Sequence, residues 1–159
     1  MARSSSNGNI RIVLTEPQPG ASDQLQAQLA EHLGMERNGG KIDVVAGAHD
    51  GLEAAQMAAQ LRPDVILLDE EMPGMSGYEA VSLISLAAPD VASVLMVNES
   101  RVERGDITAR ALRAGARAVV TPSTRPEALA ELLVELSELQ MGRSRPEYEL
   151  VTNPAKMPV

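Results

Sequence analysis

Acidic side chains gather at one point of the sequence, directly after a short apolar run. The run 65–68 is continuously apolar, and Asp69, Glu70 and Glu71 follow it. Together with Glu16, the carboxylates of Asp69 and Glu71 could form a divalent cation site built from oxygen ligands alone. A solvated acidic pocket that binds metal weakly or not at all is an alternative, and Asp69 could simply cap a turn.

Other reactive side chains are few. The chain has no Cys, which excludes disulfides, thiolate zinc sites, iron–sulfur clusters and cysteine nucleophiles. The two His, His32 and His49, are too few for a histidine metal site. There is no phosphate-cradling GK[ST] motif, and no Ser–His–acid arrangement is visible. We therefore expect a protein that is not an enzyme.

Charge and hydropathy exclude further classes of protein. The net charge is −8 at pH 7, which repels nucleic-acid phosphates, and the two Tyr are the only aromatic residues. We therefore expect no nucleic-acid partner. No apolar run approaches 18 residues, and the first residues carry no apolar signal core, so we expect no membrane insertion and a cytoplasmic protein. Of the fourteen basic residues only Lys41 and Lys156 are Lys.

The elements that must position the acidic cluster alternate regularly. Short apolar, β-branched runs predict strands, and apolar residues at spacings of three and four predict helices between them. The strands are expected at 10–14, 42–46, 65–68, 94–97 and 118–120, and the helices at 25–33, 52–61, 78–84, 107–114 and 129–139. This alternation predicts a doubly wound α/β domain with a five-stranded parallel sheet. Ligands of such sheets bind beyond the carboxyl ends of the strands.

The domain organisation follows from composition. Residues 1–9 are rich in Ser and Asn and are expected to be disordered, and residues 10–140 hold the alternating elements. Residues 141–159 contain three Pro and no helical period, so they are interpreted as a tail or linker.

Two segments resemble a known family. RPDVILLDEEMPGMSGYEAV is similar to the phosphoacceptor segment of response-regulator receiver domains, the CheY-like domains of two-component signalling, and GARAVVTPSTRPEAL resembles their fifth-strand segment. The resemblance implies a flavodoxin-like sheet of order 2-1-3-4-5, with Asp69 as the phosphoacceptor. It also implies Mg²⁺, held by Asp69, by acids after the first strand (Glu16 here) and by the backbone carbonyl of Glu71. A histidine kinase would be the partner.

The chain departs from the family pattern at several positions. Asn98 falls where a phosphoryl-contacting Thr or Ser is usual, and Glu99 follows it. Pro122 falls on the position of a Lys that grips the phosphoryl group, Pro17 on the second acid of the first-strand pair, and Val119 on an aromatic switch residue. Glu70, Glu71 and Glu99 are expected to add negative charge beside an incoming dianion. Phosphoryl switching at Asp69 is therefore predicted to be weakened or lost.

Three functions stay open on this basis. The first is an atypical, or pseudo-, receiver that acts as a signalling or localisation module through protein contacts. The second is a working receiver that is phosphorylated on Asp69 with Mg²⁺. The third is the N-terminal localisation domain of a pilus-assembly ParA-like ATPase of the TadZ/CpaE group, which the segment 111–133 and the tail resemble in style. The partner would be a histidine kinase or the pilus and polar machinery.

An arginine-rich stretch offers a surface for partners. It comprises Arg101, Arg104, Arg110, Arg113 and Arg117. These side chains could contact an acidic partner or a second copy, so a homodimer through residues 101–140 is one interpretation. The alternative is a set of solvated Arg paired with Glu103 and Asp106.

Overall fold

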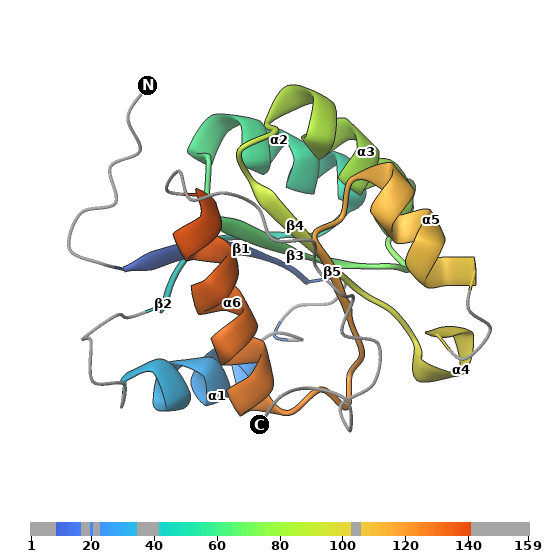
Figure 1. Cartoon of the computed structure of the whole chain (residues 1–159). Coiled ribbons are helices and arrows are strands. Elements are labelled where there is room, and N and C mark those ends of the chain that lie inside the picture. Colours follow the sequence, from blue (N-terminus) through green and yellow to red (C-terminus); the bar gives the residue numbers. More distant parts are fainter. Residues whose placement is uncertain (1–8, 17–19, 21–22, 35–41, 103–105, 141–159) are drawn as a thin grey trace.

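The computed structural model describes residues 9–16, 20, 23–34, 42–102 and 106–140 (Figure 1). Five strands form one parallel sheet, and its order, β2-β1-β3-β4-β5, confirms the predicted fold. The strands are β1 (Ile10–Thr15), β2 (Ile42–Ala48), β3 (Val65–Asp69), β4 (Ala92–Met96) and β5 (Ala118–Val120). The predicted disordered terminus 1–8 and the predicted tail 141–159 lie outside the described residues.

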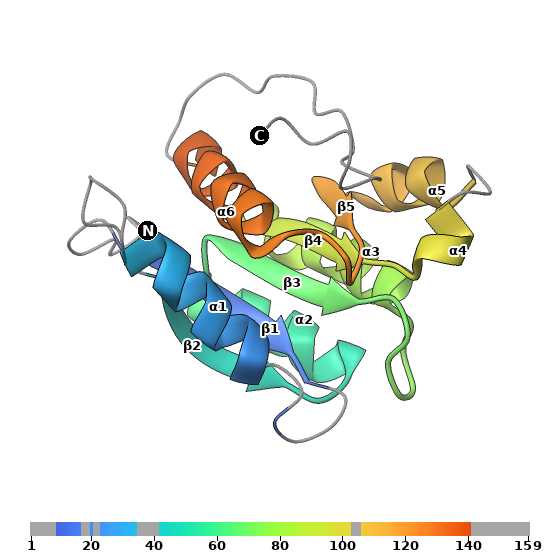
Figure 2. The same cartoon turned by 90° about the horizontal axis from the view of Figure 1, so that it is seen from below.

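Helices cover both faces of the sheet (Figures 1 and 2). The helices are α1 (Asp23–Gly34), α2 (Gly51–Leu61), α3 (Gly77–Ala87), α4 (Glu99–Val102), α5 (Asp106–Ala114) and α6 (Pro126–Gln140). On one face α2, α3 and α5 lie side by side, and on the other α1 packs beside α6. The central strands β3 and β4 are therefore enclosed between two layers of helix, whereas the edge strand β2 is only partly buried.

The core is aliphatic and divided by the sheet. Successive side chains of a strand point to opposite faces. Leu68 and Leu95 accordingly join the cluster beneath α2 and α3, while Leu67 and Val94 join the cluster beneath α1 and α6. Both clusters are closed by helical residues, such as Ile84 on the first face and Leu133 on the second.

One helix is not among those the sequence predicts. The four-residue α4 follows β4, and its residues carry no apolar period that a pattern of spacing could detect. No helix within the described ranges is long and apolar enough to cross a membrane.

Candidate functional site

Parallel strands bring the predicted site residues to one edge of the sheet. Asp69 is the last residue of β3, Glu16 follows β1, Asn98 lies two residues after β4, and Pro122 lies two residues after β5. Because the carboxyl ends of parallel strands meet at the same edge, all four positions lie at one edge of the sheet.

The backbone of Asp69 is held by the neighbouring strand. The hydroxyl of Thr15, at the end of β1, accepts the Asp69 N–H at 2.9 Å and donates to the carbonyl of Leu67 at 3.2 Å. Thr15 therefore fixes the last residue of β3 at its position. The sequence interpretation missed this role, because a Thr at a strand end carries no signal of its partner.

The Asp69 carboxylate lies half-buried beside two other acids. Its Oδ1 accepts the backbone N–H of Glu71 at 3.3 Å. Burial is the main cause that raises the pKa of Asp69 above its usual value, and the carboxylates of Glu71 and Glu70 raise it further. Backbone N–H bonds oppose this shift but do not outweigh it. The candidate phosphoacceptor thus sits in a negative, partly desolvated environment.

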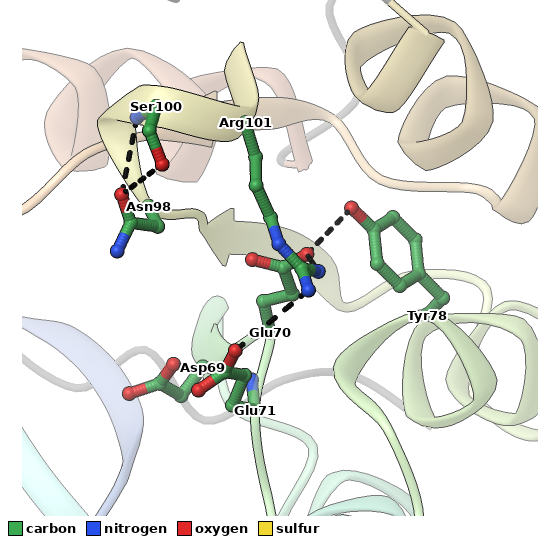
Figure 3. Close-up of polar contacts among 7 residues, drawn as sticks. All are labelled: Asp69, Glu70, Glu71, Tyr78, Asn98, Ser100 and Arg101. Atoms are coloured by element: carbon green, nitrogen blue, oxygen red, sulfur yellow. Dashed lines mark hydrogen bonds and ion pairs between the residues drawn. The ribbon is translucent and has the colours of Figure 1, made fainter. Parts of the chain in front are cut away.

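Glu70 is predicted from the sequence to add negative charge beside an incoming dianion, and the structure shows that this charge is paired. Its side chain is only 4% exposed, and its Oε1 forms an ion pair with the guanidinium of Arg101 on α4 (Figure 3). The same oxygen accepts the hydroxyl of Tyr78 at 3.3 Å. A buried carboxylate must be compensated by a cation or by hydrogen bonds, and Glu70 has both.

Tyr78 extends this contact to a third helix. The guanidinium of Arg110, on α5, lies 4.2 Å from the centre of the Tyr78 ring, a cation–π arrangement. Burial and the adjacent Glu70 carboxylate raise the pKa of Tyr78 to about 12, so its hydroxyl remains a donor at neutral pH. Glu70, Arg101, Tyr78 and Arg110 therefore form one network, which joins the end of β3 to α3, α4 and α5.

The two ends of the Asn98 side-chain amide differ in their contacts. Its Oδ1 accepts the backbone N–H of Ser100 at 3.1 Å and the Ser100 hydroxyl at 2.9 Å, which caps the start of α4. The amide nitrogen is turned away from α4, toward the side of the site where Asp69 lies (Figure 3). This nitrogen is a hydrogen-bond donor at the position where the family has a hydroxyl.

The turn 121–124 after β5 carries no charged side chain, and the exposed Arg125 follows it before α6. Pro122, at the expected Lys position, is exposed. The N–H of Thr121 donates to the hydroxyl of Thr124 at 3.1 Å, and the Thr124 N–H donates to the Thr121 carbonyl at 3.0 Å. Val119, at the aromatic switch position, is fully buried in the sheet. Hydrogen bonds between Thr121 and Thr124 thus close the turn that contains this position.

The predicted metal ligands are only partly brought together. Oε2 of Glu16 lies against Gly47 of β2, 3.1 Å from where a Cβ would stand. Within the described ranges, no three acidic or histidine side chains gather closely enough to hold a metal ion by themselves. The Asp69 carboxylate and the Glu71 carbonyl still offer oxygen ligands, and Mg²⁺ is commonly bound by one or two carboxylates together with phosphate oxygens and water. These donors fit Mg²⁺ in that mode.

The arginine-rich stretch is divided by the structure. Arg101 and Arg110 are exposed but contact the buried Glu70 and Tyr78, respectively, whereas Arg113 is exposed on α5 and takes no part in this network. Arg104 and Glu103 lie outside the described residues. The homodimer through residues 101–140 stays a prediction.

Comparison with known proteins gives the chain its family. Residues 22–134 match the family model of the response regulator receiver domain. A protein-glutamate methylesterase/protein-glutamine glutaminase of Thermotoga maritima is 47% identical over 80 residues, which cover 50% of this chain and 23% of the relative. A protein of the same name from Myxococcus xanthus is 31% identical over 162 residues, covering 96% of this chain and 43% of the relative.

Solved structures agree with this assignment. The response regulator domain of Thermotoga maritima CheB superposes with a TM-score of 0.61 at 30% identity, covering 86% of this chain and 98% of that domain. The receiver domain of the putative response regulator NarL from Mycobacterium tuberculosis gives a TM-score of 0.59 at 26% identity, with 85% and 98% coverage. The chain spans less than half the length of the two methylesterase relatives. The chain belongs to the response regulator receiver domains, the CheY-like domains of two-component signalling.

Proposed function

We propose that this receiver domain accepts a phosphoryl group on Asp69 from a histidine kinase, with Mg²⁺, and acts as a switch in two-component signalling. The observation that carries the proposal is the placement of Asp69. Its backbone is fixed by Thr15, while its half-exposed carboxylate stands at the open edge of the central strand. The likeness to the CheB receiver domain supports the same function. Receiver domains are typically cytoplasmic, and we place this one there.

The residues of the site suit an in-line transfer. A carboxylate oxygen of Asp69 would form a bond to phosphorus while the bond from phosphorus to the histidine nitrogen of the kinase breaks. The amide nitrogen of Asn98 would donate a hydrogen bond to a phosphoryl oxygen. Mg²⁺, when bound by the Asp69 carboxylate and the Glu71 carbonyl, would neutralise charge on the phosphoryl oxygens. The domain would itself be modified and would turn over no separate substrate.

Mass spectrometry and NMR test this function directly. The protein would be incubated with acetyl phosphate and Mg²⁺, and the intact mass measured. We expect a gain of one phosphoryl group that is absent in Asp69→Asn. Mg²⁺ with beryllofluoride, a mimic of the phosphoryl group, should give saturable amide shifts around residues 16, 69, 71 and 98. No adduct and no shifts at millimolar beryllofluoride would refute the proposal.

A pseudo-receiver is the second candidate, and one observation favours it. Pro122, which the sequence resemblance aligns with the phosphoryl-gripping Lys, is exposed in the turn after β5 and carries no charge. In that case the fold would serve as a docking module whose partner binding does not change with Mg²⁺ or acetyl phosphate. The localisation domain of a pilus-assembly ATPase stays a prediction from the sequence, and the relatives described above bear other names.

A further inference from the structure

At the end of β3, negative charges outnumber the positive charges that could stabilise an added phosphoryl group. Three consecutive carboxylates, those of Asp69, Glu70 and Glu71, occupy it. Phosphorylation would turn the singly charged Asp69 carboxylate into an acyl phosphate that carries about two negative charges at pH 7. Among the described residues, the cation in direct contact with this cluster is Arg101, which pairs with Glu70 and lies 3.9 Å from Oε1 of Glu71.

The pairing of Arg101 leaves part of its guanidinium accessible. Its side chain is 48% exposed, in contrast to the 4% of Glu70. Nη1 contacts Glu70, whereas Nη2 makes only the long contact to Glu71. A guanidinium carries five N–H donors in a planar fork that suits phosphate oxygens. Arg101 can therefore keep its ion pair with Glu70 and still offer N–H donors to a second anion.

Glu71 links Arg101 to the phosphoacceptor. Glu71 lies between the two residues, because its carboxylate contacts Arg101 and its backbone N–H bonds Oδ1 of Asp69 at 3.3 Å (Figure 3). A dianion on Asp69 would compete with the exposed carboxylate of Glu71 for Nη2. A dianionic phosphoryl group attracts a guanidinium more strongly than one solvated carboxylate does.

We propose that Arg101 is the cation that binds the phosphoryl group on Asp69, exchanging its contact with Glu71 for the phosphoryl oxygens while it keeps Glu70. This inference rests on the proposed function. It assigns to α4 the positive charge that the turn after β5 lacks. It also makes Glu70 a positioning residue, because its buried carboxylate holds the guanidinium near the site.

The experiment compares two variants that both lack the buried carboxylate. Affinity for beryllofluoride with saturating Mg²⁺ would be measured by amide NMR titration for Glu70→Gln and for Glu70→Gln with Arg101→Gln. Gln can still accept the Tyr78 hydroxyl, and neither variant leaves a buried unpaired charge. We expect the double variant to bind about tenfold more weakly, the loss of a charge-assisted contact.

A matched control separates contact from net charge. Glu70→Gln with Arg110→Gln removes the same charge from a residue that lines the same surface pocket. This control should bind within about twofold of Glu70→Gln, because screening weakens charges without direct contact. Arg101→Gln compared with Arg110→Gln in the unaltered chain gives the same contrast while the buried carboxylate of Glu70 stays in place.

The outcomes distinguish the two claims. Equal affinities of the Arg101 and Arg110 variants, both with Glu70→Gln and with Glu70 unaltered, would overturn the role of Arg101 and leave phosphorylation of Asp69 standing. Absence of beryllofluoride binding by the unaltered protein would overturn both. A selective loss in the Arg101 variant supports both.

Discussion

Two loops at the same edge of the sheet differ in how they are held. The loop after β3 is tied to other elements by charge, since Glu70 pairs with Arg101 of α4 and accepts the hydroxyl of Tyr78 on α3. The loop after β5 is tied to itself, through hydrogen bonds between Thr121 and Thr124. The end of β3 thus has a cation in direct contact from α4, whereas the turn 121–124 carries no charged side chain.

The tight packing of the β3 loop predicts the largest effect. A Cβ on Gly77 would meet the Asp69 carbonyl oxygen and would lie 2.6 Å from Cδ1 of Leu95. Since backbone atoms cannot give way, Gly77→Ala should lower the free energy of unfolding by about 3 kcal/mol. Urea denaturation measures this loss. Gly74→Ala is the control, because its Cβ would meet nothing within 4 Å and only its φ of +75° opposes Ala. Equal losses would contradict the packing argument.

The second largest loss of stability is expected when the cation Arg101 is removed. Arg101→Gln leaves the Glu70 carboxylate buried without its charged partner, and this is strongly unfavourable. We expect a clear fall in the urea midpoint, smaller than that of Gly77→Ala. Adding Glu70→Gln should restore most of the midpoint, because the unpaired charge is then gone. A double variant as unstable as Arg101→Gln would show that the ion pair is not the cause.

A substitution in the loop after β5 should lower the free energy of unfolding by a smaller amount. Thr124→Val keeps the shape of the side chain but removes the hydroxyl that accepts the Thr121 N–H. The loss of one such bond predicts a decrease of about 1 kcal/mol in the free energy of unfolding. Thr124→Ser, which keeps the hydroxyl, should stay closer to the unaltered protein. Identical stabilities of the Val and Ser variants would exclude this bond as a contributor.

The smallest change in stability is expected at the exposed end of the same loop. Pro122→Lys should alter the free energy of unfolding by less than about 0.5 kcal/mol, since the position is exposed. The new cation should strengthen beryllofluoride binding about threefold at low salt, with Pro122→Gln as the uncharged control. Equal affinities for the Lys and Gln variants would mean that this loop lies too far from the phosphoacceptor to matter.

The fold could be predicted because each large element carries its own periodic pattern. Strands 65–68 and 118–120 are continuous apolar runs, and the stripe of Leu on α6 has helical spacing. The short α4 could not be predicted in this way. It is four residues long and begins with a cap by Asn98, a contact that local composition does not distinguish from a turn.

The site could be predicted only in part. Asp69 was found because an acid at the end of an apolar strand is a local signal, and the geometry places it at the open edge. The roles of Glu70 and Arg101 depend on a contact between residues 31 positions apart. Nothing in either segment alone indicates that Glu70 is buried or that Arg101 reaches it, so their charges were interpreted separately.

The hydroxyl of Thr15 has a further consequence for the behaviour of the phosphoacceptor. It gives its single proton to the carbonyl of Leu67 and receives the amide proton of Asp69. That amide is therefore hydrogen-bonded, although it lies at the end of the strand. Hydrogen exchange at Asp69 should follow opening of the whole sheet, so the chemistry of its carboxylate can proceed without any local loosening of the chain that carries it.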